Sequence, residues 1–140
     1  MMKVVYVAGP FTGPTPWHVE QNVRRAELVG RCVAEAGASP LMPHSNTRFF
    51  MGIQTPQFWY DATIALLAKS EGLVLIPGWR KSQGTMVELA WARQHRLPVF
   101  TAAFHGDMSV GTMHATIGCL DSGDFAGGPG VLAFQDWVLR

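Results

Sequence analysis

The sequence predicts a three-layer α/β domain in which a parallel sheet of four to five strands is covered by helices on both faces. Short runs rich in branched apolar residues alternate with longer segments whose apolar residues recur every three or four positions. The short runs are almost continuously apolar, as is typical of strands that are buried on both sides. This alternation of strand and helix is the pattern that parallel sheets produce.

The first strand is predicted at residues 3–8, KVVYVA, and Gly9-Pro10 ends it with a turn. A helix is expected over residues 18–36, because its valines and alanines keep helical spacing and Gly37 follows where glycine commonly ends a helix. Residues 39–43, SPLMP, predict a short second strand. The next segment, 44–54, has no periodicity and is expected to be a loop.

Thr55 and Pro56 are typical of an N-cap and a first helical residue, and they predict a helix that continues to about Lys69. A third strand is expected at 73–77, a helix from Ser82 or Thr85 to His95, and a fourth strand at 97–102. Seven glycines follow Phe104, so we expect the tail to be largely loop, with a strand or short helix in 130–140. We expect one domain, 1–140, whose glycine-rich tail, 103–140, completes the domain or an oligomer interface.

Composition excludes several classes of protein. The chain has 140 residues, 48% of them hydrophobic, and a net charge of +1, which gives no electrostatic footprint for a nucleic acid polymer or a membrane surface. Two distant cysteines and five histidines show no metal-binding spacing. No apolar run has the length of a signal peptide or a membrane span. We therefore expect a cytoplasmic protein that needs neither metal nor redox cofactor.

Candidate ligand contacts follow the first three predicted strands. Ligands of parallel sheets bind beyond the carboxyl ends of the strands, where loops and helix N-termini favour anions. Together these loops predict a cradle for a phosphate or a sugar, although each loop alone is more typical of an ordinary connection. The candidates are Gly9, Pro10 and Phe11, then His44 and Asn46, and finally Ser82, Gly84 and Thr85. Four aromatic residues offer either base stacking or core packing: Phe11, Trp17, Phe49 and Trp59.

Glu88 is a single carboxylate within an otherwise apolar helical run, 85–92. One interpretation is a capping box, since Thr85 and Glu88 fit the S/T-x-x-E pattern. If the helix instead begins near Ser82, Glu88 lies on the face toward the sheet and becomes a poised carboxylate. Ser82 is then either an N-cap or a phosphate ligand.

Asp61 and Tyr6 are the candidate partners of Glu88. Chemistry at the anomeric carbon of a sugar uses two carboxylates, which lie about 5 to 5.5 Å apart when configuration is retained. Asp61 shares its helical face with Phe58, Ile64 and Ala65, so we expect it to be buried and protonated, as an acid catalyst requires. The alternative is an aspartate that interacts with the helix dipole. Tyr6, near the end of the first strand, either orients Glu88 or belongs to the core.

Three motifs, VYVAGPFTG, WYDAT and LVLIPGWRKSQGTMVELAWA, together resemble the nucleoside 2-deoxyribosyltransferase superfamily over residues 3–101. The resemblance implies a flavodoxin-like or Rossmann-like sheet and no cofactor. It implies cleavage or transfer at the N-glycosidic bond of a 2′-deoxyribonucleoside or its 5′-monophosphate, through a covalent sugar ester. Glu88 would be the nucleophile, Asp61 the acid and Tyr6 the orienting group, while Ser82 would suit a 5′-phosphate. It also implies a homodimer or higher homo-oligomer in which the neighbouring subunit completes the sugar pocket.

Two other functions stay open at this point. The segment PGWRKSQGTMVE is similar to the PGGxGTxxE motif of the cytokinin-activating phosphoribohydrolases, although the upstream arginine of that family is not located here. A non-catalytic nucleotide sensor would use the same cradle without turnover.

Overall fold

The computed structural model of the chain describes residues 1–119 and 133–140. It has a five-stranded sheet in the order β2-β1-β3-β4-β5. The strands are β1 (Val4–Ala8), β2 (Ser39–Leu41), β3 (Gly72–Leu75), β4 (Val99–His105) and β5 (His114–Cys119). The first four are parallel, and β5 pairs with β4 in the antiparallel direction. The predicted α/β fold is confirmed, with one antiparallel edge strand added.

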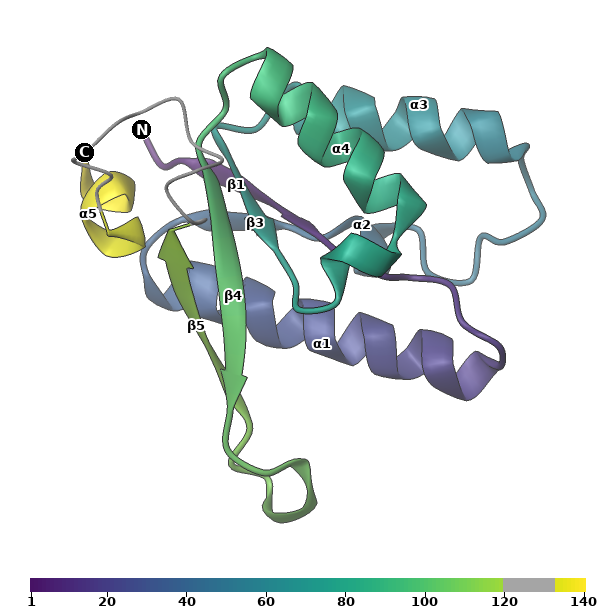
Figure 1. The fold of residues 1–140 in the computed structure, drawn as a ribbon, viewed down its shortest axis with the longest axis horizontal. Helices are drawn as coiled ribbons and strands as arrows, with labels where there is room; N and C mark the ends of the chain where they lie inside the picture. The colour runs from purple at the N-terminus through teal and green to yellow at the C-terminus, as the bar shows by residue number, and fades with distance from the viewer. Residues whose placement is uncertain (120–132) are drawn as a thin grey trace.

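Helices cover both faces of this sheet (Figure 1). One face carries α1 (Pro16–Glu35) and the short α5 (Phe134–Leu139), and the other carries α3 (Pro56–Leu67) and α4 (Gln83–Gln94). The remaining pieces are the single turn α2 (Pro43–Asn46) and two 3₁₀ turns at Trp79–Lys81 and Met108–Val110. Within the described residues, no helix combines the length and hydropathy needed to cross a membrane.

The alternation of side chains along β1 divides the interior into two cores. Val5 and Val7 point toward α1 and α5, whereas Tyr6 and Ala8 point toward α3 and α4. All four are fully buried, which explains why the strand reads as a continuous apolar run. Tyr6 is therefore the polar group that β1 carries into the second core.

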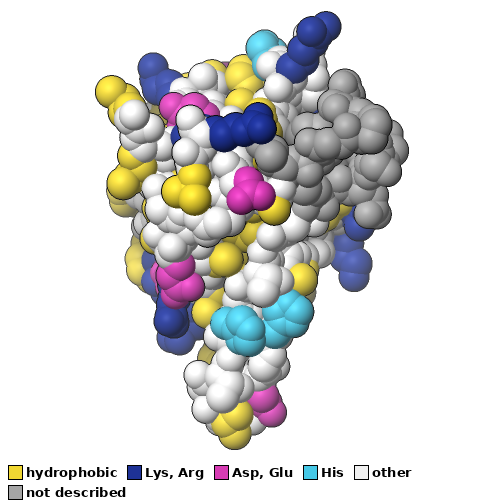
Figure 2. Space-filling view, turned by 90° about the vertical axis from the view of Figure 1, so that its left-hand side faces the viewer, with side chains coloured by type: hydrophobic (Ala, Val, Ile, Leu, Met, Phe, Trp, Pro, Cys, Tyr) yellow, Lys and Arg dark blue, Asp and Glu magenta, His cyan; other side chains and the backbone are white. Residues whose placement is uncertain are grey.

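The tail differs from its prediction as a loop. β4 runs on to His105 and turns back through Gly106 into β5, so that a β-hairpin projects beyond the body of the domain (Figure 1). Gly106 has a φ of +86°, and a side chain there would meet the Thr112 carbonyl oxygen at 2.3 Å. Histidine side chains gather over this hairpin (Figure 2), where His105 and His114 face each other across the strand pair. The glycines that suggested a loop are in part turn residues.

Two smaller predictions also change. Residues 43–46 form the helical turn α2, although Pro43 was expected at the end of the second strand and 44–46 in the loop that follows it. The closing segment, left open between strand and helix, is the helix α5 from Phe134 onward, and the rest of that segment lies outside the described residues.

Thr55 is the N-cap of α3, as predicted, and its side chain accepts a hydrogen bond from the Phe58 N–H at 3.2 Å. We expect Thr55→Ala to lower the free energy of unfolding by about 0.5–2 kcal/mol, because that N–H loses its partner. Thr55→Ser keeps the oxygen and should retain most of the stability. Denaturant unfolding of the three proteins measures this, and equal stability of wild type and Thr55→Ala would contradict the assignment.

Candidate active site

The strand order places a crevice at one edge of the sheet. β1 continues through α1 to β2 on one side, and β3 lies on the other side of β1, so the connections that follow β1 and β3 diverge. A cavity of about 860 Å³ lies there, a size suited to a small ligand. Its walls come from four segments, 6–12, 43–54, 56–63 and 81–88.

Glu88 lines this cavity from α4. The helix is capped by Ser82, whose side chain accepts a hydrogen bond from the Thr85 N–H at 3.2 Å, so Thr85 is not the cap and the capping-box interpretation of Glu88 is wrong. Glu88 instead lies further along the helix, where its Oε2 is buried and has no hydrogen-bond partner. Burial raises the pKa of this carboxyl to about 7.

Tyr6 is the hydrogen-bonding neighbour of Glu88. The tyrosine is 1% exposed, and burial followed by the nearby carboxylate raises the pKa of its phenol far above the ordinary value. The phenol therefore stays protonated and donates its hydrogen to Glu88. Thr63 of α3 lies beside the Tyr6 hydroxyl, and its own hydroxyl donates to the Tyr60 carbonyl oxygen at 3.0 Å. The sequence-based pairing of Tyr6 with Glu88 agrees with this geometry.

Asp61 does not join them, and the expectation that it is buried is wrong. Its side chain is exposed, accepts a hydrogen bond from Gln57 at 2.9 Å, and lies outside the cavity. Helical spacing explains the error, because the face of α3 that lines the cavity carries residues 56, 59, 60 and 63. Asp61 lies about 100° around the helix from Tyr60. The geometry of the described chain therefore gives Asp61 no role at Glu88.

The cavity gathers most of the predicted binding residues, which are Gly9, Pro10, Phe11, His44, Ser82, Gly84 and Thr85. Asn46 is exposed at the end of α2 and does not line it, since two residues of helix turn it away from His44. Of the four aromatic candidates, Phe11 and Trp59 line the cavity, whereas Trp17 and Phe49 are exposed elsewhere.

Several lining residues were not singled out in the sequence. They are Thr12, Thr47, Gln54, Tyr60, Thr63, Lys81 and Gln83. Tyr60 and Thr63 follow Pro56 and Trp59 at helical spacing, and this stripe was a readable signal for the cavity-facing side of α3.

His44 holds the loop after β1 in place. Its Nε2 lies 3.1 Å from the Gly9 carbonyl oxygen and 2.9 Å from that of Pro10, and the ring meets Phe11 edge to face. The imidazole is 6% exposed, and this burial lowers its pKa. In the described parts of the chain, no three histidine, cysteine or acidic side chains are grouped as a metal site would require.

Residues 3–101 match a protein family described as "Domain of unknown function (DUF4406)". No curated protein matches the chain. Among solved structures, a 2-deoxyribosyltransferase from the psychrotolerant bacterium Bacillus psychrosaccharolyticus is 19% identical, with a TM-score of 0.52 over 69% of each chain. BlsM is 26% identical, with a TM-score of 0.51 over 69% of this chain and 62% of its own. These similarities agree with the fold that the sequence motifs implied.

The raised pKa of Glu88 predicts a pH-dependent stability. The pKa of Glu88 is about 7 in the folded protein and 4.5 in the unfolded chain. The folded protein therefore loses stability as pH rises from 4.5 to about 7, because the buried carboxyl must ionise. We expect Glu88→Gln to raise the free energy of unfolding at pH 8 by up to about 3 kcal/mol relative to wild type. The gain should disappear toward pH 4.5. Denaturant unfolding at several pH values measures it, and a variant that is less stable than wild type at pH 8 would contradict the burial of a charged carboxylate.

Proposed function

This chain belongs to the family described as "Domain of unknown function (DUF4406)", and we propose that it cleaves or transfers at the N-glycosidic bond of a 2′-deoxyribonucleoside or its 5′-monophosphate. The observation that carries this proposal is the Glu88 carboxylate, which is buried in a cavity, bonded by Tyr6, and left with one unpartnered oxygen. The similarity to a 2-deoxyribosyltransferase supports the same class of reaction.

In the first step, an oxygen of Glu88 attacks C1′ of the sugar while the C1′–N bond breaks. The electron pair of that bond goes to the base nitrogen, which takes up a proton from water, and a glycosyl ester forms on Glu88. In the second step, water or another base attacks C1′, and the Glu88 carboxylate leaves. A proton returns to solvent from the attacking group. Two displacements at the same carbon give net retention.

The residues of the chain contribute orientation and charge. The Tyr6 hydroxyl bonds to Glu88 and so fixes the orientation of the carboxylate, whose Oε2 is buried and has no partner among the described residues. Glu88 is the only carboxylate among the described residues that line the cavity, so no second carboxyl group from these residues assists departure of the base. The nucleophile is then the central catalytic group of this chain.

A 5′-phosphate fits the beginning of α4. Ser82 Oγ accepts hydrogen bonds from the N–H of Thr85 at 3.2 Å and from its hydroxyl at 2.9 Å, so the proton of Ser82 itself remains available to a ligand. Lys81 lines the same part of the cavity, and the helix N-terminus favours an anion. These features support the monophosphate over the free nucleoside.

The homo-oligomer stays a prediction. Exposed apolar side chains that such an interface could cover include Phe58, Met86 and Val87 of α3 and α4, which are 43%, 41% and 48% exposed.

We expect the protein to release free base from 2′-deoxynucleoside 5′-monophosphates, with a rate that rises as pH increases through about 7, because only ionised Glu88 attacks. Glu88→Gln should abolish release at every pH while leaving the fold intact. Chromatography of a mixed pool of nucleosides and nucleotides measures this.

Other outcomes of the same incubation would favour one of the two rival functions or contradict the proposal. Release from ribonucleoside monophosphates alone would support a phosphoribohydrolase. Recovery of bound nucleotide intact after long incubation would support a sensor. Base release that survives in Glu88→Gln would contradict the proposal.

Ser82→Asp tests the phosphate subsite. Aspartate preserves the N-cap of α4 but repels a phosphate, so kcat/KM for the 5′-monophosphate should fall at least about tenfold. The value for the free nucleoside should change little. Steady-state kinetics on both substrates measure the difference, and an equal loss on both would place the phosphate elsewhere.

A further inference from the structure

Two buried side-chain atoms in the described parts of the chain lack a hydrogen-bond partner, and both belong to residues that line the same cavity. One is Oε2 of Glu88, which the proposed reaction uses. The other is Nδ1 of His44. Buried polar groups are nearly always paired in folded proteins, so an unpaired one on a residue that lines a cavity is free to pair with a bound molecule or with water.

The bonds of the other ring nitrogen determine what kind of partner this is. Nε2 of His44 lies within hydrogen-bond distance of two carbonyl oxygens, those of Gly9 and Pro10. Carbonyl oxygens only accept, so Nε2 carries the hydrogen. Because burial keeps the imidazole neutral by lowering its pKa, Nδ1 has a free lone pair. His44 therefore offers the cavity an acceptor, which suits an N–H or O–H donor and repels a phosphate or carboxylate.

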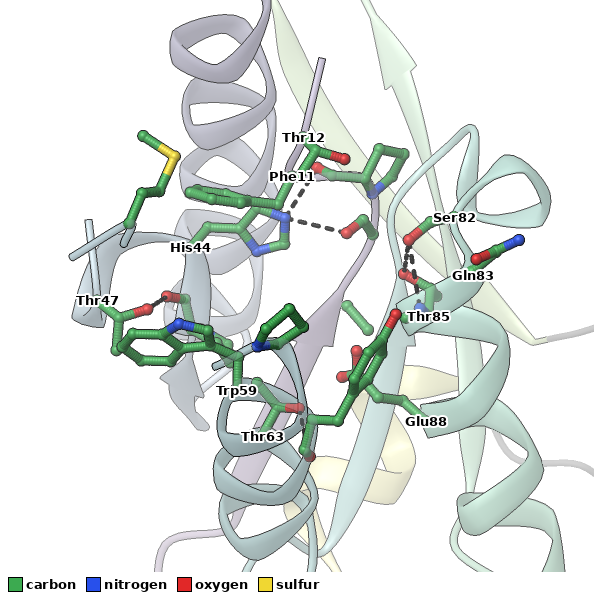
Figure 3. A pocket seen from close by; sticks show the side chains of 18 of the residues that line it. Phe11, Thr12, His44, Thr47, Trp59, Thr63, Ser82, Gln83, Thr85 and Glu88 are labelled. Atoms are coloured by element: carbon green, nitrogen blue, oxygen red, sulfur yellow. Dashed lines mark hydrogen bonds between the residues drawn. The ribbon is translucent and has the colours of Figure 1, made fainter. Parts of the chain in front are cut away.

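Figure 3 shows where this acceptor lies relative to the reaction centre. His44, Phe11 and Trp59 form one side of the cavity, while Glu88, Ser82 and Thr85 form the other. The ring nitrogen of His44 without dashed lines points toward the space beside Trp59. If the anomeric carbon lies at Glu88 and the 5′ group at Ser82, both ends of the sugar are on the second side. The base then extends between the aromatic side chains toward His44.

We propose that His44 Nδ1 accepts a hydrogen bond from the exocyclic amino group of the substrate's base, which makes His44 a specificity-determining residue for amino-bearing bases. This inference rests on the proposed function, because that function places a base in the cavity. A base with an oxo group at the same position would place the lone pair of its oxygen against that of His44 Nδ1, which is repulsive. A site built around a hydrogen bond discriminates strongly against an analogue that cannot form it.

Binding measured without turnover tests this inference. In the Glu88→Gln background, calorimetry compares amino and oxo partners of the same size: 2′-deoxycytidine with 2′-deoxyuridine 5′-monophosphate, and 2′-deoxyadenosine with 2′-deoxyinosine 5′-monophosphate. The amino member of at least one pair should bind at least about tenfold more tightly. Adding His44→Phe should reduce that ratio to about one, because phenylalanine fills a similar volume and has no acceptor.

Two further readouts keep the inference falsifiable if His44→Phe folds poorly. The ¹⁵N resonance of His44 Nδ1 in the Glu88→Gln protein should move toward the hydrogen-bonded position when the amino member binds, and not when the oxo member binds. A 2′,3′-dideoxy analogue tests the other donor source. If the His44-dependent affinity follows the 3′-hydroxyl instead, the assignment to the base is overturned.

Equal affinity within both pairs, or discrimination that persists in His44→Phe, would also overturn the inference, since Nδ1 would then make no bond to the base. Failure of the proposed function is a separate result. It appears as absent base release in the wild-type protein, whatever the binding preference of the Glu88→Gln protein.

Discussion

The contact between the Tyr6 hydroxyl and the Glu88 carboxylate is the constraint on which the rest of the site depends. It joins β1 to α4 and holds a carboxylate in a buried position, where ionisation is unfavourable and its pKa rises to about 7. A carboxylate that is weakly solvated and fixed by one hydrogen bond is a stronger nucleophile than one in water. Under the proposed function, the protein gives up stability at this residue in exchange for reactivity, as active sites commonly do.

The fold supplies this contact through simple periodicities. Alternation along β1 sends Tyr6 to the face covered by α3 and α4, and the cap at Ser82 sets the rotation of α4 that brings Glu88 to the same place. The divergence of connections at β1 and β3 leaves the space above them open. His44, from the short turn after β2, lines the opposite side of the cavity and makes hydrogen bonds to the loop that follows β1. The cavity thus has the Glu88 carboxylate at one side and the acceptor nitrogen of His44 at the other.

Strong periodic signals made the parallel strands, the flanking helices and the pair Tyr6 and Glu88 predictable from the sequence. α3 misled the placement of Asp61, because this helix is apolar nearly all round and its exposed face carries Phe58, Ala65 and Ala68. Without a polar face, the sequence alone does not indicate which side meets the sheet. The β4–β5 hairpin was missed for a different reason. An antiparallel edge strand buries only one face, and the glycines of its turn look the same as those of a loop.

The most direct test of the central claim is to trap the sugar on the enzyme. Protein quenched with acid during turnover of a 2′-deoxynucleoside 5′-monophosphate should gain the mass of one 2-deoxyribosyl 5-phosphate group, and peptide mapping should locate it on Glu88. The Glu88→Gln protein should gain nothing. Base release accompanied by an adduct on another residue, or by no adduct under conditions where the ester is stable, would contradict the assignment of Glu88 as nucleophile.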